Sequence, residues 1–147
     1  KKIMTMAKER NVELLLPDDF VVAPEGKEGV KIQVVAWNRM PADMGGFDIG
    51  PQTIKKFGAA IMKAKTIFWN GPLGLFEVEP FSRGTVEIAK KIAQSGAVSV
   101  VGGGDTIAAI NQAGVADKMT HISTGGGASL EFVEGRKLPG VEVLLSK

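Results

Sequence analysis

Apolar and polar positions along the later two thirds of the chain switch between strand-like runs and helix-like spacing. Short apolar runs predict strands over residues 66–69, 97–101 and 120–123. Amphipathic stretches predict helices over residues 51–64, 82–95, 105–113 and 127–134. Strands that alternate with helices indicate βαβ units and a mostly parallel sheet.

The first third of the chain and its end follow a different pattern. Residues 1–10 predict a helix with no capping residue before it, so we expect the chain to be cut within a longer helix. Apolar runs predict strands over residues 12–16, 19–23 and 30–36, and turn residues join the last two into an antiparallel side hairpin. Three glycines, one proline and two aspartates predict a loop over residues 38–50. Residues 141–145 predict a terminal strand or an extended tail.

Composition excludes several classes of protein. The chain has 147 residues, 44% of them hydrophobic and 23% charged, which suits one domain with a hydrophobic core. The net charge is only +2 and acids are interleaved with lysines, which argues against a nucleic-acid partner. Cysteine is absent, which suits a reducing compartment. No apolar run approaches the ~20 residues that span a bilayer, so we expect a cytoplasmic protein without a membrane partner.

Three predicted strands end in unusual loops, which a parallel sheet would place at one edge, where α/β proteins bind ligands. The first loop, residues 70–77, has two glycines around Pro72. Such a rigid loop lets its backbone approach a ligand closely. Asn70 offers a donor and an acceptor, and Glu77 could accept from ribose hydroxyls. A tight turn without any ligand is the alternative interpretation of this loop.

Residues 102–106 and 123–129 each contain three consecutive glycines and lead into a predicted helix. Glycines clear space for phosphate, and unpaired N–H groups at a helix start attract it. Asp105 would repel phosphate unless a cation lay between them, and Mg²⁺ binds through one carboxylate with phosphate oxygens and water. An Asp or Thr cap at residue 105 or 106 is the alternative. Neither the P-loop pattern nor the dinucleotide glycine pattern occurs.

Other side chains receive plainer interpretations. His121, the one histidine, adjoins the third loop. A general base is one interpretation of it, and a structural hydrogen-bonding side chain is the favoured one. Trp37 and Trp69 are predicted to pack in the core rather than to stack on bases.

At these loops the chain resembles the phosphoglycerate kinase family in the order and spacing of its motifs. The matching segments are residues 48–53, 68–77, 101–106, 121–131 and 134–141. The resemblance covers essentially the whole chain. It implies that residues 1–147 are the later part of the C-terminal, nucleotide-binding domain, without the N-terminal substrate domain. The fold implied is α/β: a Rossmann-like three-layer domain with a mostly parallel sheet and a small side hairpin, lacking its first strands.

The resemblance also implies an activity. The family transfers a phosphoryl group between 1,3-bisphosphoglycerate and ADP in glycolysis, with Mg²⁺, and the complete enzyme is expected to be a monomer. This chain would supply the Mg-ADP/ATP site, and 3-phosphoglycerate would bind only through the absent domain. The family's Gly-Gly-Ala-Lys segment and its phosphoglycerate-binding arginine are absent, so we expect the isolated chain to be inactive. A non-catalytic nucleotide-binding module and a folding fragment that binds nothing tightly are the alternatives.

Site roles follow from the resemblance residue by residue. Gly46 and Phe47 would line the adenine pocket, although the preceding Met44-Gly45 departs from the pair common in the family. Asp105 would reach the metal, and Thr106 a phosphate. The expected nucleotide-binding residues are Gly46, Phe47, Asn70, Pro72, Leu75, Glu77, Gly103, Gly104, Asp105 and Thr106. The expected residues that steady the transferring phosphoryl group are Gly125, Gly126 and Gly127.

Overall fold

Two small sheets and the helices around them organise the chain, of which the computed structural model describes residues 1–145. The order of the elements is α1 (Lys2–Glu9), β1 (Asp19–Ala23), β2 (Gln33–Ala36), β3 (Gly45–Ile49), α2 (Pro51–Ile61), β4 (Thr66–Asn70), α3 (Arg83–Gln94), β5 (Val98–Gly102), α4 (Gly104–Gln112), a 3-10 turn at Ala116–Lys118, β6 (His121–Ser123), α5 (Gly126–Val133) and α6 (Pro139–Leu145). The alternation of strands and helices predicted from residue 51 to residue 134 is confirmed.

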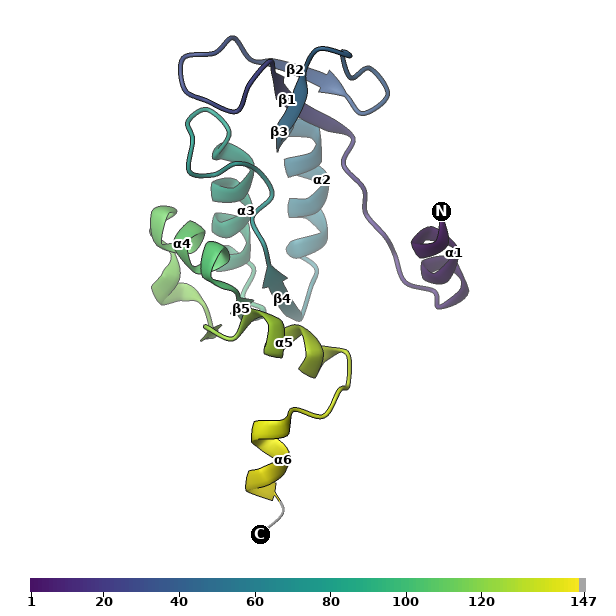
Figure 1. Ribbon diagram of the computed structural model, residues 1–147, viewed down its shortest axis with the longest axis vertical. Coiled ribbons are helices and arrows are strands. Elements are labelled where there is room, and N and C mark those ends of the chain that lie inside the picture. Colours follow the sequence, from purple (N-terminus) through teal and green to yellow (C-terminus); the bar gives the residue numbers. More distant parts are fainter. Residues whose placement is uncertain (146–147) are drawn as a thin grey trace.

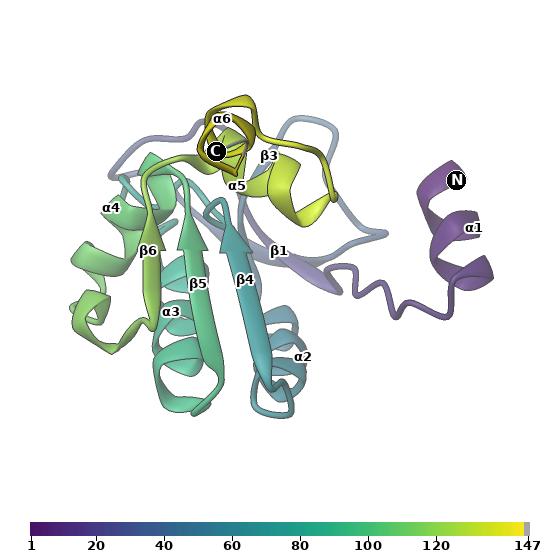
Figure 2. The ribbon, with the colours of Figure 1, turned by 90° about the horizontal axis from the view of Figure 1, so that it is seen from below.

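The parallel sheet has the order β4-β5-β6. Figure 2 shows α2 and α3 behind this sheet and α5 in front of it, beside the arrowheads of the strands. Residues of α5 and of the front face of β4 and β5 line one hollow, which places α5 on that face. Helices on both faces of a parallel sheet confirm the α/β class.

The hydrophobic core lies between the parallel sheet and the helices behind it. Trp69 of β4 and Val101 of β5 are buried against Ile88 and Ile92 of α3 and Ile110 of α4. The predicted apolar face of α2 packs against this cluster through Ile54, Phe57 and Ile61, whereas Met62 is exposed. Burial of such side chains stabilises the fold by about 1.5–3 kcal/mol each. The core therefore holds the strand ends of the parallel sheet in place.

The second sheet is antiparallel and has the order β2-β1-β3. The predicted side hairpin is confirmed, because β1 pairs with β2 from Asp19–Ala36 to Val22–Gln33. The loop predicted over residues 38–50 is wrong in its second half, because β3 pairs with the other edge of β1. Because β3 begins with two glycines, its sequence lacks the alternation of apolar and polar residues that predicts a strand. The strand forms because its backbone pairs with β1. This sheet lies across the N-terminal ends of α2 and α3 (Figure 1).

Buried carboxylates of this sheet receive the first amides of the helices. Asp19 of β1 accepts from the amides of Gln52 (3.0 Å) and Thr53 (2.8 Å) in the first turn of α2. Asp48 of β3 accepts from the amide of Gly84 (2.6 Å) in the first turn of α3. Carboxylates at helix N-termini satisfy unpaired amides and complement the helix dipole. The small sheet thereby fixes where both helices begin.

Three predictions fail where a local pattern meets no partner. The strand predicted over residues 12–16 does not form, because no strand among residues 1–145 pairs with it. Residues 141–145, predicted as a terminal strand or an extended tail, belong to helix α6, which begins at Pro139, a residue that the first turn of a helix tolerates. Trp37 is 65% exposed and lies outside the core.

Helix α1 confirms the predicted first helix, with no side-chain cap. It lies apart from the rest of the chain in Figures 1 and 2 and contains no buried residue. Among residues 1–145, no helix has the length and the apolar character needed to cross a membrane.

Candidate functional site

The three loops singled out from the sequence begin at one level of the parallel sheet. Asn70 ends β4 and pairs with Gly102 of β5, which pairs with Ser123 of β6. The amide of Gly103 donates to the carbonyl of Ser123 (3.3 Å), joining the second and third loops. The structure therefore brings the loops together as the parallel arrangement predicts.

Asn70 lies at the centre of this junction. A β-carbon at Gly102 or Gly103 would lie 3.1 Å or 3.6 Å from its Nδ2, and one at Gly126 would lie 3.7 Å from it. A β-carbon at Gly126 would also lie 2.9 Å from the Cα of Gly103, closer than real side chains approach a backbone. Gly103 has a φ of +92°, a conformation that favours glycine. Glycine is thus required where the second and third loops touch.

Two helices begin at these loops with glycine caps. Gly103 precedes α4 and Gly125 precedes α5, and neither cap uses a side chain. The cap predicted at Asp105 or Thr106 is wrong, because α4 begins at Gly104 and both residues lie in its first turn. Amides in the first turn of a helix have no partner within the helix. The amide of Gly126 donates to the carbonyl of Thr124 (3.1 Å). The amides of the exposed Gly104 and Gly127, in the first turns of α4 and α5, lie at this edge.

Asp105 and Thr106 differ in their surroundings although they are neighbours. Thr106 is 1% exposed, and its Oγ1 accepts from the amide of Gly71 (2.7 Å), which joins the first loop to α4. Asp105 is exposed. Within residues 1–145 no three acids or histidines gather in a group that could hold a metal ion by themselves. A single exposed carboxylate fits a Mg²⁺ ion that takes its other ligands from phosphate and water.

The first loop continues from Asn70 to a hollow of about 360 Å³ that its residues 72–75 line. Four of the expected nucleotide residues line it: Gly46, Phe47, Pro72 and Leu75. The amide of Leu75 donates to the carbonyl of Phe47 (2.8 Å), which ties the first loop to β3. Glu77 is exposed and does not line the hollow. Apart from Glu77, the predicted residues thus fall into a group around this hollow and a group at the glycine loops, with Asn70 in the second group.

The hollow also contains residues that the sequence pattern did not single out. Phe20, Leu73, Gly74 and Asp48 line it. The pattern of residues 38–50 predicts a loop, in which nothing marks Asp48 as a buried carboxylate. Burial raises the pKa of Asp48 to about 6, while hydrogen bonds from the amides of Gly84 and Ile49 oppose that rise.

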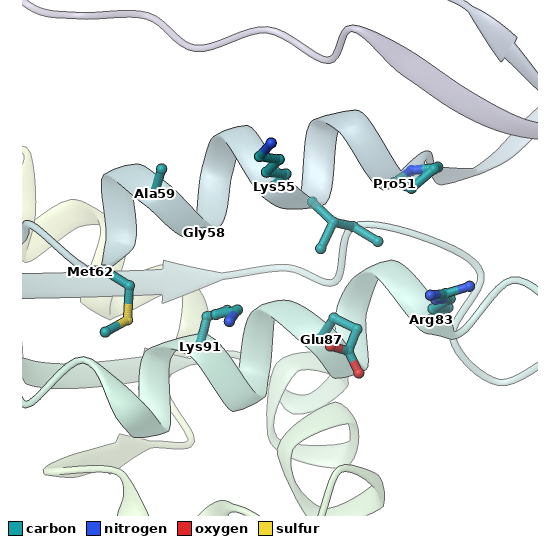
Figure 3. Close-up of a pocket in the computed structure, with 9 residues that line it drawn as sticks. Pro51, Lys55, Gly58, Ala59, Met62, Arg83, Glu87 and Lys91 are labelled. Carbon is teal, nitrogen blue, oxygen red and sulfur yellow. The ribbon is translucent and has the colours of Figure 1, made fainter.

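A further groove, of about 420 Å³, runs between α2 and α3 (Figure 3). Lys55, Arg83, Glu87 and Lys91 line it, and none of the expected site residues does. The side chain of Lys91 in α3 lies 3.5–3.8 Å from the position that a β-carbon at Gly58 of α2 would occupy, so it packs over Gly58 where the two helices are in contact. This groove is a feature of the helix contact, and strand ends do not reach it.

His121 lies at the start of β6, exposed, and lines a hollow of about 520 Å³ with Phe68, Val100 and Phe132. That hollow is on the sheet face opposite the helical core. The mainly apolar lining of this hollow does not support the interpretation of His121 as a general base.

The fold and the site define a class: an α/β protein with glycine-rich loops at the carboxyl edge of a parallel sheet, the edge where such folds bind ligands. Comparison with known proteins then identifies the family. The family model for phosphoglycerate kinase matches residues 1–136. The chain belongs to the phosphoglycerate kinase family.

Individual relatives agree with this assignment. The chain is 54% identical over its whole length to a phosphoglycerate kinase of Pelotomaculum thermopropionicum, of which it covers 37%. It is 52% identical to one of Rubrobacter xylanophilus, over 98% of this chain and 36% of that protein. The solved phosphoglycerate kinase of Coxiella burnetii superimposes with a TM-score of 0.92 at 43% identity, over 97% of this chain and 37% of that one. The chain thus spans little more than a third of the length of these relatives.

Proposed function

We propose that this chain supplies the Mg²⁺–nucleotide site of a phosphoglycerate kinase. The observation that carries the proposal is the junction of the three loops, with Asn70 between glycines of the second and third loops. Amides at the starts of α4 and α5 suit phosphate groups, and the hollow lined by Phe47, Pro72 and Leu75 suits the base and sugar.

The division of labour between the loops follows from their chemistry. Gly103 and Gly104 would hold the phosphates of the nucleotide, and Asp105 would hold the metal. The expected phosphate contact of Thr106 would require its buried side chain to become accessible. Gly125, Gly126 and Gly127 would face the transferring phosphoryl group. Bound Mg²⁺ would neutralise part of the phosphate charge. Glu77 would reach ribose hydroxyls from outside the hollow.

The same site is incomplete for phosphoryl transfer. Residues 70–77, 102–106 and 123–129 contain no lysine or arginine. Phosphoryl transfer depends on positioning and on neutralising charge in the transition state. We infer that transfer between 1,3-bisphosphoglycerate and ADP needs cationic groups and an acceptor site that these three loops do not supply. A coupled assay of this chain alone should detect no turnover, and a rate near that of a complete kinase would contradict the inference.

Calorimetric titration with Mg-ADP tests the proposed site. We expect saturable binding that weakens when EDTA removes Mg²⁺. Asp105→Asn should raise the Kd of Mg-ADP about tenfold, because one charge-assisted metal ligand is lost. Asp117→Asn is the matched control, since Asp117 is an exposed acid beyond the far end of α4. No saturation at millimolar Mg-ADP would instead support the folding-fragment alternative.

A further inference from the structure

Asp48 of β3 accepts a hydrogen bond from α3 and also lines the hollow proposed to receive the nucleotide. It is 2% exposed and belongs to β3. One of its carboxylate oxygens, Oδ2, accepts from the amide of Gly84 at the start of α3 (2.6 Å), and Oδ1 accepts from the amide of Ile49 (2.8 Å). Burial of a carboxylate is unfavourable unless hydrogen bonds compensate it. The two amide hydrogen bonds therefore compensate part of the free-energy cost of burying the Asp48 carboxylate, a cost that a neutral side chain would not carry.

The loop that follows β4 rests directly on this carboxylate. A β-carbon at Gly74 would overlap Asp48 Oδ1 and would lie 2.6 Å from the carbonyl oxygen of Phe81. A β-carbon at Gly84 would overlap the same oxygen and would lie 2.5 Å from Cγ1 of Ile49. Glycine at both positions lets the loop and α3 close on the carboxylate from two sides. The position of the loop thus depends on the shape and hydrogen bonds of Asp48.

Backbone hydrogen bonds hold the same loop to the elements beside Asp48. The amides of Leu73 and Gly74 donate to Oγ1 of Thr85 in α3 (3.1 and 3.2 Å). The amide of Leu75 donates to the carbonyl of Phe47, the residue before Asp48 (2.8 Å). Loop residues 72–75 all line the hollow. A shift of β3 relative to α3 would therefore change the shape of the hollow.

We propose that Asp48 is a positioning residue that holds loop residues 72–75 between β3 and α3, and so shapes the half of the site that receives the adenosine part of the nucleotide. The inference rests on the proposed function of the site. Asp48 acts through Gly74 and Gly84. Within residues 1–145, the hydrogen bonds of Asp48 and its contacts with glycines do not include the glycine loops before α4 and α5. Those two loops are the ones proposed to hold phosphate.

Asp48→Asn separates positioning from simple helix capping. The asparagine keeps the shape and one carbonyl acceptor, but its NH₂ group faces an amide that needs an acceptor. Two probes report on the two halves of the site by NMR titration: adenosine for the hollow and Mg-pyrophosphate for the glycine loops. We expect the Kd of adenosine to rise about tenfold and that of Mg-pyrophosphate to change less than about twofold.

Asp19→Asn is the matched control. Asp19 is an equally buried carboxylate that receives the first amides of α2, and it does not line the hollow. We expect this variant to bind both probes as the unchanged chain does. Equal weakening of both probes by Asp48→Asn, or an equal loss of adenosine binding in Asp19→Asn, would overturn the positioning role.

Amide hydrogen exchange without ligand decides the same question independently of nucleotide binding. In Asp48→Asn the amides of Leu73, Gly74 and Leu75 should exchange about tenfold faster, while those of α2 keep their rates. Unchanged exchange in this loop would overturn the proposal. If the unchanged chain bound neither probe, the proposed function would fail, and the exchange rates would still show whether Asp48 holds the loop.

Discussion

Asp48 makes the stability of the chain depend on pH in a direction opposite to that of most carboxylates. Burial raises its pKa from 3.8 to about 6 in the folded chain. Because the folded pKa lies above the unfolded one, protonation favours the folded state. The resulting stabilisation is complete below the unfolded pKa and is lost as the pH rises through the folded pKa.

The magnitude follows from the two pKa values. One pKa unit corresponds to about 1.36 kcal/mol. Between pH 7 and pH 5 the folded chain takes up nearly one proton at Asp48, whereas the unfolded chain takes up almost none. Integrated over this range, the free energy of unfolding should rise by about 1 kcal/mol from this residue alone.

The assay compares the unchanged chain with Asp48→Asn, which does not titrate. Urea unfolding at pH 5, 6 and 7, followed by the fluorescence of the buried Trp69, gives the free energy of unfolding of each protein. Other groups titrate in both proteins, so the difference between them isolates Asp48. The unchanged chain should gain about 1 kcal/mol on the variant from pH 7 to pH 5. A difference that is constant with pH, or that changes in the other direction, would refute the reasoning.

Further predictions concern packing, the glycine junction and exposed apolar surface. Gly126→Ala should raise the Kd of Mg-ADP at least about tenfold. The new β-carbon would lie 2.9 Å from the Cα of Gly103, so the second and third loops would have to move apart. An unchanged Kd in calorimetry would refute the close contact. Phe81→Ala should lower the free energy of unfolding by about 3–5 kcal/mol, since Phe81 is fully buried against Phe47. Trp37→Ala should change it by less than about 0.5 kcal/mol, and urea unfolding checks both. The chain should self-associate at high concentration through exposed apolar residues such as Phe132, which is 69% exposed. Phe132→Ser should reduce this association, and light scattering that shows only monomer would contradict it.

Strands and helices with both a clear period and a clear stop signal were predictable from the sequence. The parallel strands and α2, α3, α4 and α5 form within a few residues of their expected bounds. The loops at the strand ends were predictable too, since the carboxyl ends of parallel strands share one edge. The register of Asn70, Gly102 and Ser123 places the three loops at one level.

Features that depend on distant pairing were not predictable from local pattern. Residues 12–16 have the composition of a strand but no partner, whereas β3 has glycines at its start and forms because β1 lies beside it. Trp69 and Trp37 are the same residue type, and only the packing of α3 behind β4 decides that Trp69 is buried. Asp48 gains its significance from Gly74 and Gly84, which are far from it in sequence.

The most direct test of the proposed site is a titration of the ¹⁵N-labelled chain with Mg-ADP, followed by NMR. The largest amide shifts should occur at Gly103, Gly104 and Asp105, at Gly126 and Gly127, and at Leu75 beside the hollow. The amides around Lys55 and Lys91, in the groove between α2 and α3, should not move. Shifts confined to that groove, or none at millimolar Mg-ADP, would contradict a nucleotide site at the three loops.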